Sequence, residues 1–257
     1  MSVQVVPISR ELVRDAATAV ADAFFDNEIW VWLLQRDWQR RRLLPRHYRA
    51  MIRNVYVPRG AAWTTPDAIG AALWFPPGTL RMSRRERLAE MSSLLPEGID
   101  SFGRGGRWEE LISEHHPKEP HWYLQTLAVA PSAQRGGIGT ALIEPGLARA
   151  DADGVGAYLE TQRESNIPYY RRFGFELTDE ISLHDSPPLW LMWRPAGGSL
   201  PARQARRRPA QSAGSSSSSL ASLQRPFETR SAMSPRPHSS SGWSAVITAA
   251  RPASVSC

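Results

Sequence analysis

Apolar positions along the first 195 residues alternate between helical and strand-like spacing. Helical spacing, with apolar residues returning every three or four positions, predicts helices at 11–25, 38–55, 82–116 (interrupted at 96–98), 137–153 and 167–173. Runs rich in β-branched residues or alternating in polarity predict strands at 3–8, 60–65, 69–75, 122–129, 156–161, 175–183 and 189–193.

The order of these elements predicts an α/β fold. The strands at 60–65 and 69–75 form a hairpin around Pro66-Asp67, whereas the later strands are joined through helices. A mixed sheet is therefore expected, and a doubly wound parallel sheet is not.

Polar residues within two of the predicted helices suggest how each helix is oriented. Three consecutive arginines, 40–42, give the helix at 38–55 a charged face, which we expect to be solvated. In the helix that follows Ser83, the spacing of Ser83 and Glu86 predicts a capping box. The apolar stripe of that helix is expected to consist of Leu88, Met91 and Leu94.

Composition separates the C-terminal end of the chain from the rest. Residues 196–257 contain 16 Ser, eight Arg and a single Glu, with an unbroken serine run at 215–219. A segment of this composition cannot bury a core. We therefore predict one folded domain over 1–195 and a Ser/Arg/Pro-rich disordered tail over 196–257.

The tail also carries the basic charge of the chain. The whole chain has a formal net charge of +6, and the tail contributes about +7 of it, which leaves residues 1–195 at about −1. A basic tail without a basic domain gives no reason to expect a specific nucleic-acid partner.

Cysteine content and the N-terminus bear on the compartment. The single cysteine, Cys257, is terminal, no apolar run is long enough to cross a membrane, and the N-terminus lacks a secretory pattern. We expect a cytoplasmic protein without a membrane partner; monomer and dimer both remain open.

The stretch 127–142 carries the clearest chemical signal. An apolar strand ends at Pro131, a polar turn follows, and Gly137 and Gly139 open a helix. Helix N-termini present unpaired N–H groups and a partial positive charge, so this arrangement predicts an anion site. It is not a dinucleotide fingerprint, since Leu142 stands where the third glycine would be, and no lysine follows the glycines as in a P-loop.

The motif Gln134-x-x-Gly137-x-Gly139 after a Leu-x-Val strand resembles the acyl-CoA pyrophosphate loop of the GNAT superfamily of N-acetyltransferases. Further runs in consistent order resemble the puromycin N-acetyltransferase branch of that superfamily, namely 116–124, Leu159-Glu160-Thr161 and 166–175. The resemblance is good from about residue 115 to residue 195. It implies a GNAT fold, with a mixed, largely antiparallel sheet flanked by helices and a splayed central strand.

The resemblance also implies acetyl-CoA as cosubstrate. In such enzymes a β-bulge in the central strand frees backbone N–H groups for the thioester oxyanion and the pantetheine arm, and carry-over places these groups at Leu127, Ala128 and Val129. The remaining cofactor contacts are expected from Asn166, from the acid Tyr170, and from Gln134, Arg135, Gly136, Gly137, Ile138, Gly139 and Thr140 around the pyrophosphate.

Proton transfer needs an acid and a base. Tyr170 matches the tyrosine that such enzymes use as general acid for the departing CoA thiolate. The acceptor ammonium must lose a proton before it attacks, and the strand position that often carries a glutamate base holds Gln125 here. Glu160, at the end of the next strand, is our first substitute. Further alternatives are His121, and Asp26 or Glu28 acting through water.

We therefore predict an N-acetyltransferase that moves an acetyl group from acetyl-CoA to a primary amine of a small molecule by direct attack in a ternary complex. Residues 1–195 contain no cysteine for a covalent intermediate. We expect no metal, because the neighbours His115 and His116 cannot easily converge with His121 on one ion.

Two other functions remain open. One is a non-catalytic acyl-CoA-binding regulatory module, and the other is a protein N-terminal or lysine acetyltransferase. Tryptophans that could line an acceptor pocket, or simply form core, are Trp30, Trp32 and Trp74.

Overall fold

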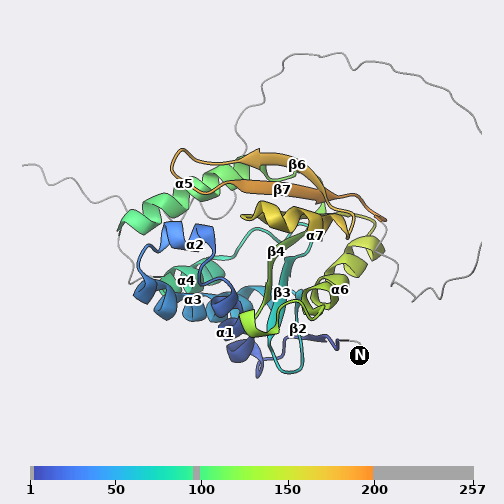
Figure 1. Ribbon diagram of the computed structural model, residues 1–257, viewed down its shortest axis with the longest axis horizontal. Helices are drawn as coiled ribbons and strands as arrows, with labels where there is room; N and C mark the ends of the chain where they lie inside the picture. Colours follow the sequence, from blue (N-terminus) through green and yellow to red (C-terminus); the bar gives the residue numbers. More distant parts are fainter. Residues whose placement is uncertain (1–2, 95–98, 199–257) are drawn as a thin grey trace, which may run out of the picture. The chain divides into compact units, whose positions relative to one another are not determined.

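The computed structural model describes residues 3–94 and 99–198. Within them one sheet of seven strands runs in the order β1-β2-β3-β4-β5-β7-β6 (Figure 1). Neighbouring strands are antiparallel except β4 and β5, which are parallel. The strands are β1 (Val6–Pro7), β2 (Ala62–Thr64), β3 (Gly70–Phe75), β4 (His121–Val129), β5 (Gly156–Thr161), β6 (Glu176–Ile181) and β7 (Leu189–Arg194).

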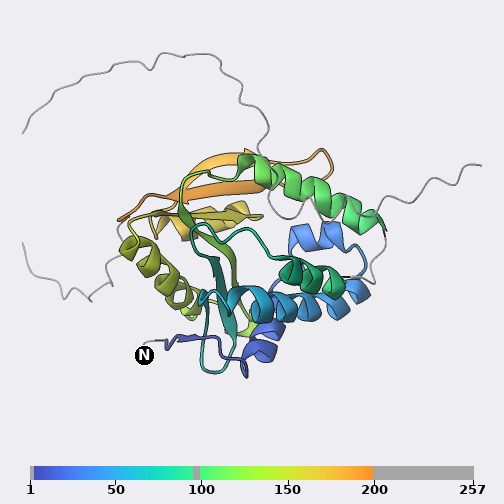
Figure 2. The same cartoon turned by 180° about the vertical axis from the view of Figure 1, so that it is seen from behind.

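Helices cover both faces of this sheet (Figures 1 and 2). One face packs against α1 (Val13–Ala23), α2 (Glu28–Leu33), α3 (Asp37–Met51), α4 (Arg84–Leu94) and α5 (Ile99–His115). The other face packs against α6 (Ile138–Ala152) and α7 (Ile167–Arg171). The predicted mixed sheet flanked by helices is thus confirmed. The predicted interruption at 96–98, and the predicted tail from residue 199 on, lie outside the described residues.

Two hydrophobic clusters, one on each face, explain why β3 is apolar throughout. All six of its residues are buried, and consecutive residues point to opposite clusters. Leu73 packs with α1 and α3, and Trp74 packs with α6. A strand covered on both faces has no solvent side, so its sequence shows no polar alternation.

A β-bulge interrupts the central strand β4. Leu73 pairs with Thr126 whereas its neighbour Trp74 pairs with Leu124, so Gln125 is one residue extra. The extra residue reverses which positions face which cluster. Leu124 and Leu127, three apart, both face α6.

Arg40 differs from its expected solvated position. Its side chain is 5% exposed, and its guanidinium donates to the backbone carbonyls of Phe25 at 2.9 Å and Leu34 at 2.6 Å, with Asp37 at 2.5 Å. Those carbonyls follow the ends of α1 and α2, where no helical N–H is left to satisfy them. One arginine of this charged run therefore caps two helix ends from a buried position, while Arg41 and Arg42 stay exposed to solvent.

Several other local expectations change. β1 is only two residues long, α1 begins at Val13, and the aromatic segment after Asn27 is helical, with the Asn27 side chain accepting from the Ile29 N–H. Leu88 is not part of an apolar stripe, because it is 67% exposed. The capping box is confirmed: the Ser83 N–H donates to Glu86 at 2.6 Å, and the Glu86 N–H donates to Ser83 at 3.3 Å.

Candidate active site

The loop from β4 to α6 forms the anion-site geometry expected from its sequence. Gly137 is the N-cap of α6 with φ of 81°, and no side chain caps the first N–H groups of that helix. Residues 134–137 are exposed, so a ligand can reach them. The Gln134 side chain does not point away: its amide donates to the Val129 carbonyl at 3.1 Å, tying the loop back to the strand.

Gly139 serves a different purpose from Gly137. A Cβ at Gly139 would lie 2.9 Å from the Tyr169 hydroxyl, so the glycine permits close approach of α7 to the first turn of α6. The Tyr169 hydroxyl is buried and has no hydrogen-bond partner among the described residues. Ile138, Gly139 and Thr140 are half-buried beside it.

The two parallel strands part at the middle of the sheet. Pairing of β4 with β5 ends at Leu124 and Leu159, and Gln125 and Glu160 are the next residue on each strand. Gln125 is exposed although it lies in the central strand. The splay therefore opens the sheet at the bulge.

Backbone groups of β4 beyond the bulge face this opening. The Ala130 N–H donates to the Ile69 carbonyl at 2.8 Å, on the β3 side. Because alternate residues of an antiparallel strand direct their backbone groups to the same neighbour, those of Ala128 also face β3, and those of Leu127 and Val129 face the β5 side. Leu127, Ala128 and Val129 are predicted to supply N–H donors. Of these, only Leu127 and Val129 direct their backbone groups away from β3 and toward the opening.

Tyr170 and Asn166 lie on the face of the sheet that packs against α6. Tyr170 is buried in the cluster around α6 and α7, and burial raises the pKa of its phenol. Asn166 donates to the Thr161 hydroxyl at 3.0 Å, which fixes the start of α7 against the end of β5. The residue predicted as acid and the asparagine predicted to contact CoA are therefore held on the same short segment.

Glu160 lies on the opposite face, in a buried polar cluster. Its side chain is 6% exposed and accepts a hydrogen bond of 2.6 Å from the Tyr123 hydroxyl at Oε2. Its second oxygen, Oε1, has no hydrogen-bond partner among the described residues, and the same holds for the buried Tyr158 hydroxyl. Burial and the nearby Glu160 carboxylate raise the pKa values of Tyr123 and Tyr158. No arginine pairs with Glu160 in the described part of the chain.

Gln125 holds the bulge through its side-chain carbonyl. That oxygen accepts from the Tyr56 hydroxyl at 3.0 Å and from the Thr126 hydroxyl. Tyr56 belongs to a π-helical turn, Ile52–Tyr56, at the end of α3. The amide at the usual base position is therefore an anchor for the strand.

The other candidate bases divide into two groups. Glu28 forms a surface ion pair with Arg163 at 2.9 Å, and the Asp26 carbonyl accepts from the same arginine. Asn27 bridges the same two segments, because its amide donates to Gln162 at 3.3 Å. His121 instead adjoins the Glu160 cluster.

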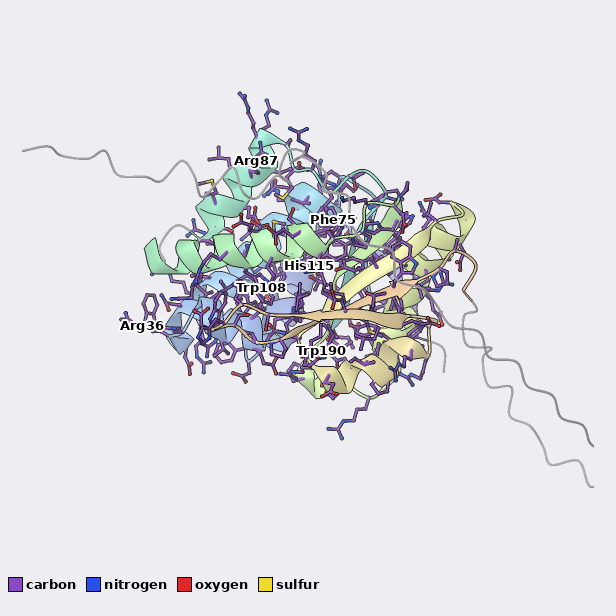
Figure 3. The ribbon with its side chains drawn as sticks, turned by 90° about the horizontal axis from the view of Figure 1, so that it is seen from above. Arg36, Phe75, Arg87, Trp108, His115 and Trp190 are labelled. Carbon is purple, nitrogen blue, oxygen red and sulfur yellow. The ribbon has the colours of Figure 1, made fainter. Side chains whose placement is uncertain are left out.

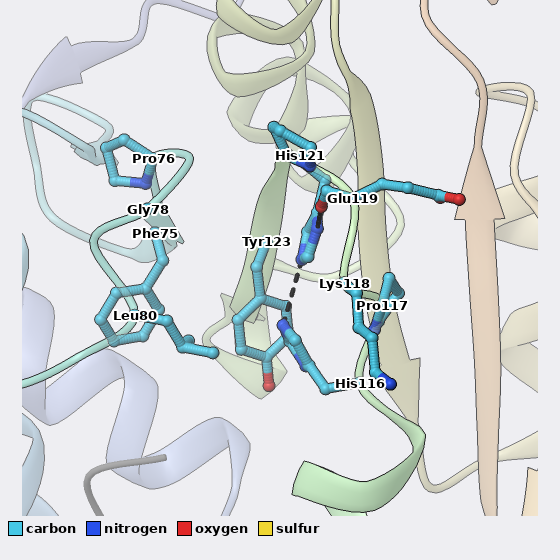
Figure 4. A pocket seen from close by; sticks show the side chains of 11 residues that line it. Phe75, Pro76, Gly78, Leu80, His116, Pro117, Lys118, Glu119, His121 and Tyr123 are labelled. Atoms are coloured by element: carbon cyan, nitrogen blue, oxygen red, sulfur yellow. Dashed lines mark hydrogen bonds between the residues drawn. The ribbon is translucent and has the colours of Figure 1, made fainter. Parts of the chain in front are cut away.

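His121 and His116 line a cavity of about 270 Å³ at the N-terminal end of β4 (Figure 4). Their Nε2 atoms are 3.1 Å apart, and His116 Nδ1 lies 3.9 Å from Glu160 Oε1. Phe75 and Tyr123, which also line the cavity, stack at 6.0 Å. The sequence suggests His116 only as a metal ligand, and His121 as a metal ligand or an alternative base. No group of three or more His, Cys, Asp or Glu side chains in the described residues could hold a metal.

Two buried carboxyls had no sequence signal. Glu90 on α4 is 5% exposed, and burial raises its pKa to about 8; Glu109 on α5 has its pKa raised to about 10 by burial and by Glu90. Both belong to helices that pattern alone marks as amphipathic surface helices. A buried glutamate cannot be told from a solvated one by spacing alone.

The three tryptophans differ in position. Trp74 is fully buried under α6, so it does not line an acceptor pocket. Trp30 donates to the Tyr48 hydroxyl at 2.9 Å, and Trp32 packs at 6.0 Å against Trp108, which Figure 3 labels with His115 on α5. No helix in the described part of the chain is long and apolar enough to cross a membrane.

Comparisons with known proteins find similarity to acetyltransferases. The sequence model of the Acetyltransferase (GNAT) family matches residues 102–175. An uncharacterised N-acetyltransferase of Schizosaccharomyces pombe is 27% identical over 202 residues, which cover 70% of this chain and 78% of the relative.

Solved structures give the same result. A Corynebacterium glutamicum structure described as histone acetyltransferase HPA2 and related acetyltransferase has a TM-score of 0.59 and 27% identity, covering 77% of this chain and 98% of the other. Arylalkylamine N-acetyltransferase 2 of Aedes aegypti has a TM-score of 0.51 at 12% identity, covering 76% and 99%, and shares the fold.

Proposed function

We propose that this chain is a GNAT-type acetyltransferase and that it transfers an acetyl group from acetyl-CoA to a primary amine of a small molecule. One observation supports a catalytic site most strongly. Gln125 is exposed in the middle of the central strand, and Glu160, the next residue on the parting strand, keeps one buried oxygen without a hydrogen-bond partner. A buried unpaired carboxylate oxygen is costly, and an ammonium group of an acceptor would satisfy it.

The cofactor is proposed to lie between β4 and β5 with its pyrophosphate on the α6 N-terminus. The uncapped N–H groups of Ile138, Gly139 and Thr140 would bind the phosphate oxygens, with Arg135 exposed beside them. The N–H groups of Leu127 and Val129 would bind the pantetheine arm and the thioester oxygen. The puromycin N-acetyltransferase branch remains part of this proposal.

The reaction we propose is direct attack. The amine loses its proton to Glu160 Oε1, and its nitrogen lone pair then attacks the thioester carbonyl carbon. The C–S bond breaks with its electrons on sulfur, and the Tyr170 hydroxyl gives a proton to the thiolate. The nitrogen loses its second proton as the amide forms, and that proton returns to the tyrosinate of Tyr170 through solvent. Because Tyr170 and Glu160 lie on opposite faces of the sheet, the acid and the base approach the opening from different sides.

A small acceptor fits the covered end of β5. The ion pair of Glu28 with Arg163 and the bond of Asn27 to Gln162 bridge the start of α2 to the segment after β5. These bridges leave less room for an extended peptide than an open groove would. Peptides nevertheless belong in the test, because the Corynebacterium relative is described as a histone acetyltransferase.

The test is thiol release from acetyl-CoA with aminonucleosides, aminoglycosides, polyamines, amino acids and peptides as acceptors. We expect turnover with at least one small amine and with no peptide. Acetyl-CoA binding without turnover on any acceptor would instead identify a regulatory module, and turnover on peptides alone would identify a protein acetyltransferase.

The cofactor position has its own prediction. Gly136 has room for a side chain, since a Cβ there would meet only the Ala133 carbonyl at 3.7 Å, so Gly136→Glu leaves the loop intact and adds a negative charge at the α6 N-terminus. Acetyl-CoA affinity measured by calorimetry should fall at least about 10-fold, while Gly136→Ala stays near wild type. Equal affinities for the two variants would place the pyrophosphate elsewhere.

A further inference from the structure

Two histidines connect the buried Glu160 to a cavity on the surface. His116 follows α5 and His121 begins β4, so the chain places them at the same end of the sheet. Their rings lie 4.9 Å apart, with the Nε2 atoms within hydrogen-bond distance (Figure 4). The side chain of His116 is 11% exposed.

Hydrogen bonds fix the direction of this pair. The Glu119 carbonyl can only accept, so the His121 Nδ1 at 2.6 Å must donate to it. In the neutral ring His121 Nε2 then carries the lone pair, and His116 Nε2–H donates to it at 3.1 Å. His116 Nδ1 is left with a lone pair, and it is the atom nearest Glu160 Oε1, at 3.9 Å.

We propose that His116 and His121 form a proton relay that carries the amine proton from Glu160 to solvent in the adjoining cavity. The inference rests on the proposed function. Glu160 passes the proton to His116 Nδ1, and the shared Nε2–H–Nε2 contact then spreads one added charge over the two rings. A base in the cavity, water or buffer, removes that proton, and Glu160 is returned to its ionised form for the next acceptor.

The surroundings of His121 favour its neutral ring, which can accept a proton. The ionisable groups facing it are Tyr123 on β4, Tyr158 and Glu160 on β5, and Lys118 and Glu119 on the loop. Burial lowers the pKa of His121, and His116 lowers it further, against the raising effects of the Glu119 carbonyl and of the Glu160 and Glu119 carboxylates. The rate should therefore rise as pH increases through the lowered pKa of His121, because a His121 ring that already holds the proton cannot accept another.

The test compares His116→Gln with His115→Gln in the full chain. His115 is the adjacent histidine, exposed at the end of α5, with its ring against the Leu111 carbonyl and outside the pair. In the thiol-release assay His116→Gln should lower kcat roughly 10-fold or more and leave the KM for acetyl-CoA unchanged. Added imidazole, at constant pH and ionic strength, should restore several-fold of the loss, whereas His115→Gln and wild type should not respond to imidazole.

A second readout does not depend on turnover. Nitrogen NMR of the ring atoms should show that His121→Gln shifts the titration of His116, as expected for a shared proton. Wild-type turnover with an unaffected His116→Gln, a kcat loss that imidazole does not restore, or independent titration of the two rings would each overturn the relay. Absence of wild-type turnover on every acceptor would overturn the proposed function itself.

Discussion

Tyr170 illustrates how burial can prepare a single residue for its proposed role. Its side chain is 8% exposed, and its ring packs edge-on to Tyr169 at 5.2 Å and to Phe175 at 6.1 Å. Burial disfavours the phenolate and so raises its pKa. A phenol that holds its proton at neutral pH is in the correct state to protonate a thiolate, and the packing keeps its position fixed.

Removing the Tyr170 hydroxyl should therefore reduce turnover selectively. Tyr170→Phe keeps the packed ring and should lower kcat about 10²- to 10⁴-fold, with little change in acetyl-CoA affinity. Tyr169→Phe is the matched control, because its hydroxyl approaches Gly139 and has no assigned proton to transfer. Thiol release and calorimetry on both variants separate the roles; equal kcat values for the two variants would remove Tyr170 as the acid.

Glu90 makes the protein less stable as pH rises. Its folded pKa is raised by burial from 4.5 to about 8, so between these values the unfolded chain loses a proton that the folded chain keeps. Glu90→Gln removes this difference. The variant should be more stable than wild type by roughly 1–3 kcal/mol at pH 8 and nearly equal to it at pH 4.

Chemical unfolding at the two pH values measures the Glu90 effect. Glu110→Gln, an exposed position on α5, is the control and should change stability at neither pH. A stability gain of Glu90→Gln that is the same at pH 4 and pH 8 would contradict the ionisation argument and would point to packing instead.

At the scale of elements, α6 is held by close approach to the sheet. A Cβ on Gly146 would lie 2.2 Å from the Trp74 ring, and Trp74 is fully buried and cannot move aside. Gly146→Ala should therefore destabilise the fold by roughly 1–3 kcal/mol, although alanine is the better helix former. Gly103→Ala on α5, where a Cβ meets nothing within 4 Å, should stabilise by about 0.5–1 kcal/mol. Thermal unfolding measures the change in stability of each variant. Changes of the same sign in both variants would contradict the packing argument.

Contiguous elements were predictable, and contacts between distant segments were not. The β4 strand, the loop at 134–137 and β5 each carry their pattern within a few residues, and the structure has them as expected. The cluster of Glu160, Tyr123 and His116 joins separate elements, and only the bulge and the β4–β5 register bring it together. Arg40 shows the same limit, because its buried acceptors are backbone carbonyls that no side-chain pattern encodes.

For the whole molecule, the last described residues extend the folded part slightly beyond the predicted boundary at residue 195. The Arg194 guanidinium is fully buried and pairs with Asp151 at 2.7 Å. The Gly197 N–H also donates to Asp151 at 3.2 Å, and the Gly198 carbonyl accepts from Arg194. The division into a folded domain and a tail therefore remains a prediction. Its boundary is best tested by ending the chain after Gly198.

Truncation tests the two-part organisation directly. A chain ending at Gly198 should keep the full thermal midpoint, acetyl-CoA affinity and turnover of the 257-residue chain, because it retains both Asp151 contacts. A chain ending at Pro195 keeps the Arg194–Asp151 ion pair but loses the contacts made by Gly197 and Gly198, and it should be less stable by about 1 kcal/mol. If the chain ending at Gly198 failed to bind acetyl-CoA, residues beyond 198 would belong to the functional domain.

The extra residue at Gln125 gives the two halves of β4 opposite phase. His121 to Leu124 carry the histidine and tyrosine of the polar cluster, and in the second half Leu127 and Val129 direct their backbone groups toward the proposed cofactor position. Deleting one residue at the bulge would put both halves in one phase and turn the side chains of Leu127 and Val129 away from α6. The single extra residue therefore lets one strand present side chains to the polar cluster along its first half and free backbone groups at the sheet opening along its second half.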